Sequence, residues 1–199
     1  MTAYSELLEF WFGELDSDGR ADAAHVQCWW SKDEAFDDLV RARFLAAHEA
    51  VSAGDHEGWL DEPRGRLAYV VALDQLPRNM FRGSERMFAT DAQALAAAEA
   101  GLEAGQDRGL GIDERAFLLM PFMHSEELSV QERGIELFTA IRDELEGDAR
   151  ERIAANLGFA VKHRDIVARF GRFPHRNALL GRASTPEELD FLTQPGSSF

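Results

Sequence analysis

A ten-residue segment, Leu67 to Leu76, is apolar on nearly every side. A helix of this kind is surrounded by other elements, because it has no polar face to turn toward water. Strand signals are scarce elsewhere in the 199-residue chain, whereas stretches rich in Ala, Leu, Glu and Arg carry apolar residues at helical spacing. The segment therefore predicts the central helix of an all-α protein.

Eight helices are expected, and several of their starts have recognisable signals. Ser31 with Glu34, and Ser129 with Glu132, form patterns typical of capping boxes. Thr185 before a proline indicates another start. The expected ranges are 3–12, 31–53, 64–77, 85–104, 112–124, 127–146, 148–171 and 186–193.

Short loops join these expected helices, which favours antiparallel neighbours. We expect a single domain over residues 1–199, built as a tetratricopeptide-like array or bundle of about seven to nine helices. A regular repeat of roughly 34 residues is not seen, because the helical segments 67–76 and 113–123 start about 45 residues apart.

The C-terminal run from Phe159 to Arg182 reverses the charge of the chain. Its net charge is +5, from six basic residues and one acid, Asp165, while the whole chain carries −15 and the remainder therefore −20. Such a reversal needs counter-charges, either from the protein's own carboxylates or from an anionic ligand. The six basic residues are Lys162, Arg164, Arg169, Arg172, Arg176 and Arg182.

The acidic balance argues against general binding to nucleic acid or to an anionic membrane, because both attract basic surfaces. No window approaches 18 apolar residues, so no transmembrane helix is expected, and the first residues lack the features of a secretory signal. The single Cys28 excludes an intramolecular disulfide and a Cys-based zinc cage. We therefore expect a cytoplasmic protein, either a monomer or a weak homodimer.

Two histidines are predicted to face the interior. His163 shares a helical face with Phe159, and His124 shares one with Phe117 and Met120. Both are candidate catalytic residues, because an imidazole titrates near neutral pH and can act as a general acid or base.

Asp74 lies within the central apolar helix. A buried carboxylate without a partner costs several kcal/mol, so it is expected to meet a cation or several hydrogen-bond donors. The available partners are Arg78, Arg82 and the basic C-terminal run. Two interpretations remain open: a buried polar network that fixes helix register, or a polar pocket between helices, where ligand sites of helical proteins lie.

The loop after the last long helix is rich in Arg, His and Phe. Arg172, His175 and Arg176 could hold a phosphate or a carboxylate there. The alternative is that these arginines pair with acidic helices of the protein itself, such as Asp33–Glu34 and Asp37–Asp38.

No metal or cofactor is expected. Side chains that could ligate a metal are present, but none has the spacing of an H-E-x-x-H motif. The chain also lacks a G-x-S-x-G elbow, a P-loop and a G-x-G-x-x-G motif. The side chains concerned are His124, Glu126, Glu127, His163, Asp165 and His175.

All four tryptophans lie in the N-terminal third of the chain. We expect them to pack in the core, because large rings usually do, with the walls of an aromatic cleft as the alternative. They are Trp11, Trp29, Trp30 and Trp59.

Seven segments, in order along the chain, carry a resemblance to a known family. They are Phe10–Gly13, Trp29–Asp33, Gly65–Gly83, Phe88–Asp91, Pro121–Glu126, Lys162–Asn177 and Leu180–Glu188. From about residue 5 to residue 193 the chain resembles the bacterial domain-of-unknown-function 924 family. The resemblance implies an all-helical fold of the tetratricopeptide-like superfamily. It implies no catalytic residue, because the family has no established activity.

These observations favour a polar interhelical pocket that binds a small anionic ligand, in a protein that could be an uncharacterised enzyme. The alternative is a tetratricopeptide-like scaffold that binds a protein partner, with a purely structural polar network. The residues predicted to form the ligand site are Asp74, Arg78, Arg82, His124, His163, Arg164, Arg172, His175 and Arg176.

Overall fold

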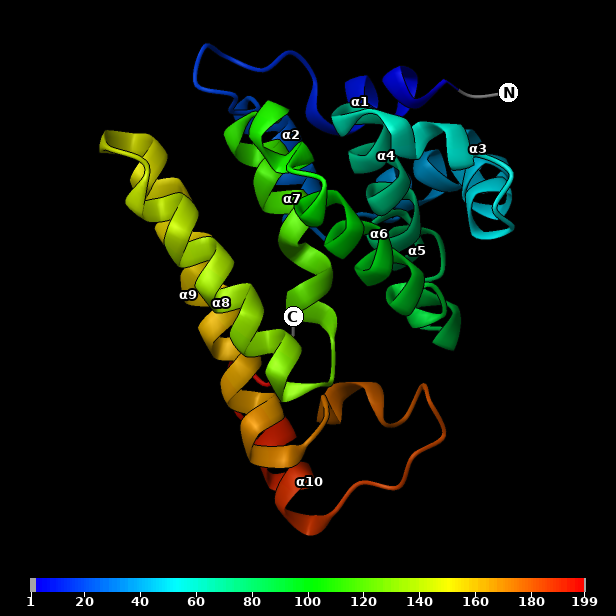
Figure 1. The fold of residues 1–199 in the computed structure, drawn as a ribbon. Helices are drawn as coiled ribbons and strands as arrows, with labels where there is room; N and C mark the ends of the chain where they lie inside the picture. The colour runs from blue at the N-terminus through cyan, green and yellow to red at the C-terminus, as the bar shows by residue number, and fades with distance from the viewer. Residues whose placement is uncertain (1–2, 199) are drawn as a thin grey trace.

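The computed structural model describes residues 3–198, and its regular secondary structure within them is entirely helical (Figure 1). The prediction of a single all-α domain is confirmed. The first half contains α1 Tyr4–Phe12, α2 Ala23–Trp30, α3 Glu34–Ser52, the 3-10 helix η1 Glu57–Asp61, α4 Pro63–Asp74, α5 Leu76–Met80 and the 3-10 helix η2 Glu85–Phe88. The second half contains α6 Asp91–Glu103, η3 Gln106–Gly109, α7 Ile112–His124, α8 Leu128–Asp143, α9 Gly147–Phe170, η4 Pro174–Arg176 and α10 Pro186–Leu192.

Helix α4 occupies the centre, as its apolar sequence predicted. It contacts α1, α3, α6 and α7, and residues such as Leu67 and Val70 have no exposed surface. The predicted helix 64–77 is nevertheless divided, because Pro77 has no N–H to donate to the carbonyl of Leu73. That carbonyl instead accepts a hydrogen bond from the hydroxyl of Thr90, at 2.5 Å.

Helices α8 and α9 form a long antiparallel pair along one side of the molecule, and α7 lies between this pair and α4 (Figure 1). Because α8 runs opposite to both α7 and α9, these two helices run in the same direction (Figure 1). Although α9 has 24 residues, no helix among residues 3–198 is both long and apolar enough to cross a membrane.

After α9 the chain turns beneath the bundle (Figure 1). Gly171 ends α9 with a left-handed conformation, φ 68°, which a residue without Cβ adopts at little cost. The following segment packs through a small second cluster of Ile166, Val167 and Phe173. This turn brings η4 below the C-terminal end of α7.

Two of the predicted helix starts are wrong. Ser31 ends α2 instead of starting α3, whose N-terminal N–H groups are accepted by Asp33. Helix α8 begins after Glu127, so Ser129 lies inside it. Thr185 does form the predicted capping box, with its hydroxyl accepting from the N–H of Glu188.

The predicted helix 85–104 is also wrong in its first part. The 3-10 helix η2 ends at Phe88, and a new helix, α6, begins at Asp91. Because of this break, the side chain of Thr90 reaches α4, and the side chain of Asp91 projects from the first turn of α6. Both side chains thereby come close to the end of the central helix.

The tryptophans only partly follow the prediction that they pack in the core. Trp11 is buried, Trp29 and Trp59 are partly buried, and Trp30 is 60% exposed. Trp30 ends the short helix α2, which has no buried residue. An exposed ring at this position therefore stands outside the core.

Candidate functional site

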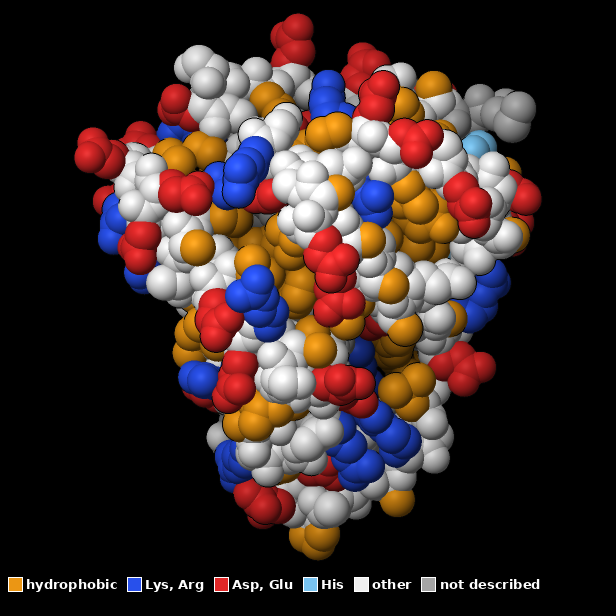
Figure 2. Space-filling model, viewed as in Figure 1, with side chains coloured by type: hydrophobic (Ala, Val, Ile, Leu, Met, Phe, Trp, Pro, Cys, Tyr) orange, Lys and Arg blue, Asp and Glu red, His pale blue; other side chains and the backbone are white. Residues whose placement is uncertain are grey.

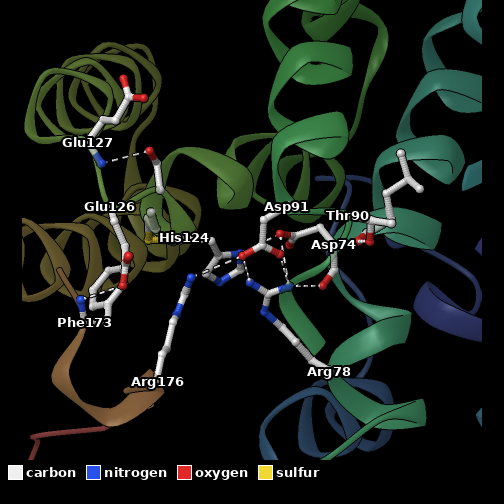
Figure 3. A network of polar contacts seen from close by, with 12 residues as sticks. Asp74, Arg78, Thr90, Asp91, His124, Glu126, Glu127, Phe173 and Arg176 are labelled. Atoms are coloured by element: carbon white, nitrogen blue, oxygen red, sulfur yellow. Dashed lines mark hydrogen bonds and ion pairs between the residues drawn. The ribbon is translucent and has the colours of Figure 1, made fainter. Parts of the chain in front are cut away.

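A buried carboxylate and a histidine meet where α4 and α7 end. Asp74 has no exposed surface, and its Oδ1 lies 2.7 Å from Nδ1 of His124, whose side chain is 15% exposed. The amide of Gln75 donates to the other oxygen, Oδ2, at 2.5 Å. Asp74 thus fixes the orientation of an imidazole that retains access to solvent (Figure 3).

Arg78 joins Asp74 to Asp91. Its Nη1 lies 3.4 Å from Oδ1 of Asp74, and the guanidinium donates to both oxygens of Asp91 at 2.9 and 3.1 Å. The prediction that Asp74 pairs with Arg78 is confirmed. Burial raises the pKa of Asp74, but Arg78 and then His124 outweigh burial and lower this pKa to about 2. Asp74 is therefore ionised at neutral pH.

His124 is neutral at the same pH. Burial, followed by the charge of Arg78, lowers its pKa, and the opposing effect of Asp74 is smaller. An ionised carboxylate only accepts hydrogen bonds, so Nδ1 of His124 carries the proton. No hydrogen bond to its Nε2 is made within residues 3–198. This nitrogen therefore has a free lone pair.

Arg176 enters the site from η4 on the opposite side to Arg78 (Figure 3). Its guanidinium packs against two phenyl rings, 4.5 Å from the centre of Phe88 and 4.6 Å from that of Phe173. The residue is 6% exposed, yet the one ion pair that it makes within residues 3–198, to Asp91, is long at 3.3 Å. Its Nε is buried and has no hydrogen-bond partner among the described residues.

Two further histidines surround Phe173. The ring centre of His163 lies 5.6 Å from that of Phe173 and 6.2 Å from that of His124, and His175 lies 5.5 Å from Phe173. Burial and the neighbouring His124 lower the pKa of His163 to about 3. Burial and the charge of Arg176 lower the pKa of His175 to about 4. Both imidazoles are consequently neutral at pH 7.

Glu126 holds the C-terminal segment against this site. It accepts a hydrogen bond from the backbone N–H of Phe173 at 2.8 Å and two from Arg182 at 2.6 and 2.9 Å. Burial raises the pKa of Glu126, but Arg182 and the Phe173 N–H lower it further than burial raises it. The position of the ring that covers Arg176 thus depends on this carboxylate. In Figure 2 Lys/Arg and Asp/Glu side chains lie in a recess between the upper body and the lower part of the molecule.

The structure brings together six of the nine residues predicted from the sequence. They are Asp74, Arg78, His124, His163, His175 and Arg176. The other three have different partners. Arg82 pairs with Asp37 on α3, Arg164 pairs with its exposed neighbour Asp165, and Arg172 donates twice to Glu188.

The structure changes the predicted partners of the C-terminal arginines. Asp37 is held by Arg82 and by the amide of Asn79, not by the C-terminal segment. The carboxylates that do meet that segment are Asp91, Glu126, Glu187 and Glu188.

Sequence reasoning missed Asp91, which is central to the site because it faces both Arg78 and Arg176. An acid in the first turn of a helix is ordinary, so its type and position gave no signal. The break at Thr90 that directs it inward was not predicted. Among residues 3–198 no group of three His, Cys, Asp or Glu side chains is arranged to hold a metal.

Comparison with known families shows to which family this chain belongs. The family described as "Bacterial protein of unknown function (DUF924)" matches residues 7–196. The chain belongs to this family. The DUF924 chain is also similar to a solved structure of a protein of unknown function from Agrobacterium tumefaciens, with 38% identity and a TM-score of 0.80. The similarity covers 95% of this chain and 96% of that one. No curated protein matches the sequence.

Proposed function

We propose that the site between α4, α7 and η4 binds a small anionic ligand and that His124 acts on this ligand as a general base. The observation that carries the proposal is the contact of 2.7 Å between the fully buried Asp74 and the partly exposed His124. A carboxylate placed behind an imidazole fixes which nitrogen keeps the proton and stabilises the imidazolium that forms when the other nitrogen accepts one. Asp74 is a positioning residue in this arrangement.

The protonation states of the site favour a base. At neutral pH a general base must be unprotonated before it acts, and the lowered pKa of His124 meets this condition. The Nε2 lone pair is available for the substrate, because Nδ1 is occupied by Asp74.

Arg176 is the group best suited to an anion. The rings of Phe88 and Phe173 both pack against its guanidinium, so its edge is the part best placed to meet a ligand. The edge of a guanidinium donates two parallel hydrogen bonds to a carboxylate or a phosphate. Arg78 is less available, because it already donates to both oxygens of Asp91.

Calorimetric titration with inorganic phosphate and with propionate tests this proposal. Arg176→Met should weaken binding by roughly tenfold or more, as expected when a charge-assisted hydrogen bond is lost. Arg164→Met is the matched control, because it removes one charge from the same segment at a residue whose ion pair, in the part of the chain that the structure describes, is with exposed Asp165. Equal affinity of the two variants for both anions would refute the anion site.

A second function, binding of a protein partner, is favoured by a separate groove. The groove lies over α7, between α6 and α8, and has a volume of about 610 Å³. Apolar side chains such as Leu119, Phe122 and Leu137 line it, and apolar surface is visible in the central hollow of Figure 2. Four acidic and three basic side chains also line the groove. Two of the basic ones, Arg115 and Arg133, pair with carboxylates, whereas Glu99 and Glu103 are exposed and have no ion pair among the described residues.

This groove fits a basic amphipathic helix, whose apolar face would meet the floor and whose charges would meet the two glutamates. A labelled peptide of alternating Leu and Lys at helical spacing, followed by fluorescence anisotropy, tests it. Glu99→Lys with Glu103→Lys should abolish binding, whereas Glu132→Lys, an exposed change on α8 that does not line the groove, should have a small effect. Loss of binding in all variants alike would indicate general charge attraction only.

A further inference from the structure

Helices α7 and α9 lie side by side in a fixed register. At one end Arg152 donates to both oxygens of the buried Asp113, at 2.7 and 2.6 Å. At the other end the rings of His124 and His163 meet edge to face, with centres 6.2 Å apart. Both pairs are 39 positions apart in the sequence (113 to 152 and 124 to 163). Because the two helices run in the same direction, corresponding positions face each other along their length.

A cavity of about 190 Å³ lies between these two ends. One face of α7, the matching face of α9 and the last turns of α2 line it. Its walls are mainly apolar and aromatic, and two of its rings, Trp30 and Phe159, are 60% and 49% exposed. The lining residues are Val26, Trp29, Trp30, Asp113, Ala116, Phe117, Met120, Arg152, Ala155, Asn156 and Phe159.

The size and walls of this cavity fit one aromatic ring. An apolar protein cavity of about 150 Å³ is known to hold a benzene molecule. Trp29, Trp30 and Phe117 present ring faces and edges at several inclinations, which suits edge-to-face contact with a further ring. The charges at the closed end, Asp113 and Arg152, already satisfy each other.

The cavity leads toward the site of His124. Met120 and Phe159 line the cavity, and each precedes a site histidine by one helical turn, about 6 Å along the axis. A hydrogen-bond path also joins the two. The amide of Gln75 donates both to the sulfur of Met120, at 3.2 Å, and to Asp74. The cavity thus ends one helical turn from His124, so a polar group on a short chain attached to a ring in the cavity would be directed toward this histidine.

We infer that the ligand of this protein carries a single aromatic ring, held in the cavity between α2, α7 and α9, and an anionic group on a short chain that reaches His124 and Arg176. Arylalkanoates and small aryl phosphates belong to this class. The inference rests on the proposed function, because it assigns the substrate class of the same site.

Three probes separate the two parts of the ligand: benzyl alcohol supplies the ring alone, propionate the anion alone, and 3-phenylpropionate both. In calorimetric titration we expect 3-phenylpropionate to bind roughly tenfold or more tighter than either fragment. Ala155→Leu fills the cavity from an exposed position and should remove this advantage, while binding of propionate persists. Ala154→Leu makes the same change at an exposed position outside the cavity and should leave all three affinities unchanged.

Trp30→Ala gives an independent check, because it opens the cavity wall at a residue that is not buried. It should weaken benzyl alcohol and 3-phenylpropionate but not propionate. The inference is overturned if 3-phenylpropionate binds no tighter than propionate, or if the Ala155 and Ala154 variants behave alike. In that case binding of propionate through Arg176 would still uphold the proposed function. If neither acid binds while benzyl alcohol does, both the proposed function and the assignment of this cavity to its ligand fail.

Discussion

Acidification from pH 7 to pH 5 is expected to destabilise the protein strongly, because it contains buried neutral histidines. His163 and His175 have pKa values of about 3 and about 4 in the folded protein, against 6.5 for the unperturbed side chain. Below pH 6.5 the unfolded chain binds protons that the folded protein does not, so the free energy of unfolding falls as the pH falls. Each such group costs about 1.4 kcal/mol per pH unit.

Between pH 6.5 and pH 5 the loss is therefore about 2 kcal/mol for each of these two histidines and about 4 kcal/mol together. His48 and His124 add to the loss, because burial lowers their pKa as well. Carboxylates lose their contribution to stability at lower pH values than the histidines do. The stability contributed by Asp74, whose pKa is lowered to about 2, is lost only as the pH falls below about 4. The window from pH 7 to pH 5 thus isolates the histidines.

Urea unfolding at pH 7, 6 and 5, monitored by circular dichroism, measures this loss. His163→Gln removes one titrating group and should reduce the loss by about 2 kcal/mol. Lys162→Gln, at the exposed neighbouring position, should retain the pH dependence of the original protein. A loss below about 1 kcal/mol at pH 5 would show that the histidines are protonated in the folded state and would refute the neutral cluster.

Three other outcomes follow from the same geometry. Asp74→Ala should lower the free energy of unfolding in urea by roughly 3–5 kcal/mol, because it leaves the buried donors of His124 and Gln75 without their acceptor and removes one of the two carboxylates that face Arg78. A loss below about 1 kcal/mol would contradict its burial. Gly65→Ala should destabilise the protein by about 1–3 kcal/mol in the same assay, because a Cβ at position 65 would lie 2.3 Å from the carbonyl oxygen of Trp59. Gly58→Ala is the control and should be tolerated, because a Cβ at position 58 would have no neighbouring atom within 4 Å. Nitrogen-15 NMR at pH 7 should show His124 protonated on Nδ1, and the opposite tautomer would exclude Nε2 as the base.

The central helix was predictable from the sequence, whereas the shorter elements around it were not. The segment at Leu67 has apolar residues all round, a signal that does not depend on neighbours. Helix α2 has only eight residues and none of them is buried, so its larger apolar residues, Val26, Trp29 and Trp30, span too little of the chain to predict a helix. The break before Asp91 depends on the hydroxyl of Thr90 reaching α4. Such a contact forms only after the chain has folded.

The candidate site was predictable where periodicity directed a polar side chain inward. This holds for Asp74, His124 and His163, which share helical faces with apolar residues. Of the five arginines predicted in the site, Arg78 and Arg176 lie there and the other three do not, because a long side chain reaches partners that sequence spacing does not specify. Arg82 and Arg172 illustrate this, since each pairs with a carboxylate on a distant element.

In the proposed site the basic C-terminal run has both roles, because some of its arginines form internal ion pairs while another contacts the anionic ligand. Arg169, Arg172 and Arg182 each lie within 3 Å of a glutamate oxygen, and these contacts fix the course of the segment. Arg176 lies at the centre of the segment that they hold, buried against two rings, with one long ion pair and an Nε that lacks a partner in the described part of the chain. Conformational entropy is the main cost of ordering a loop around a ligand. Because the neighbouring ion pairs already order this loop, the proposed anion would meet a guanidinium of Arg176 that is already in position.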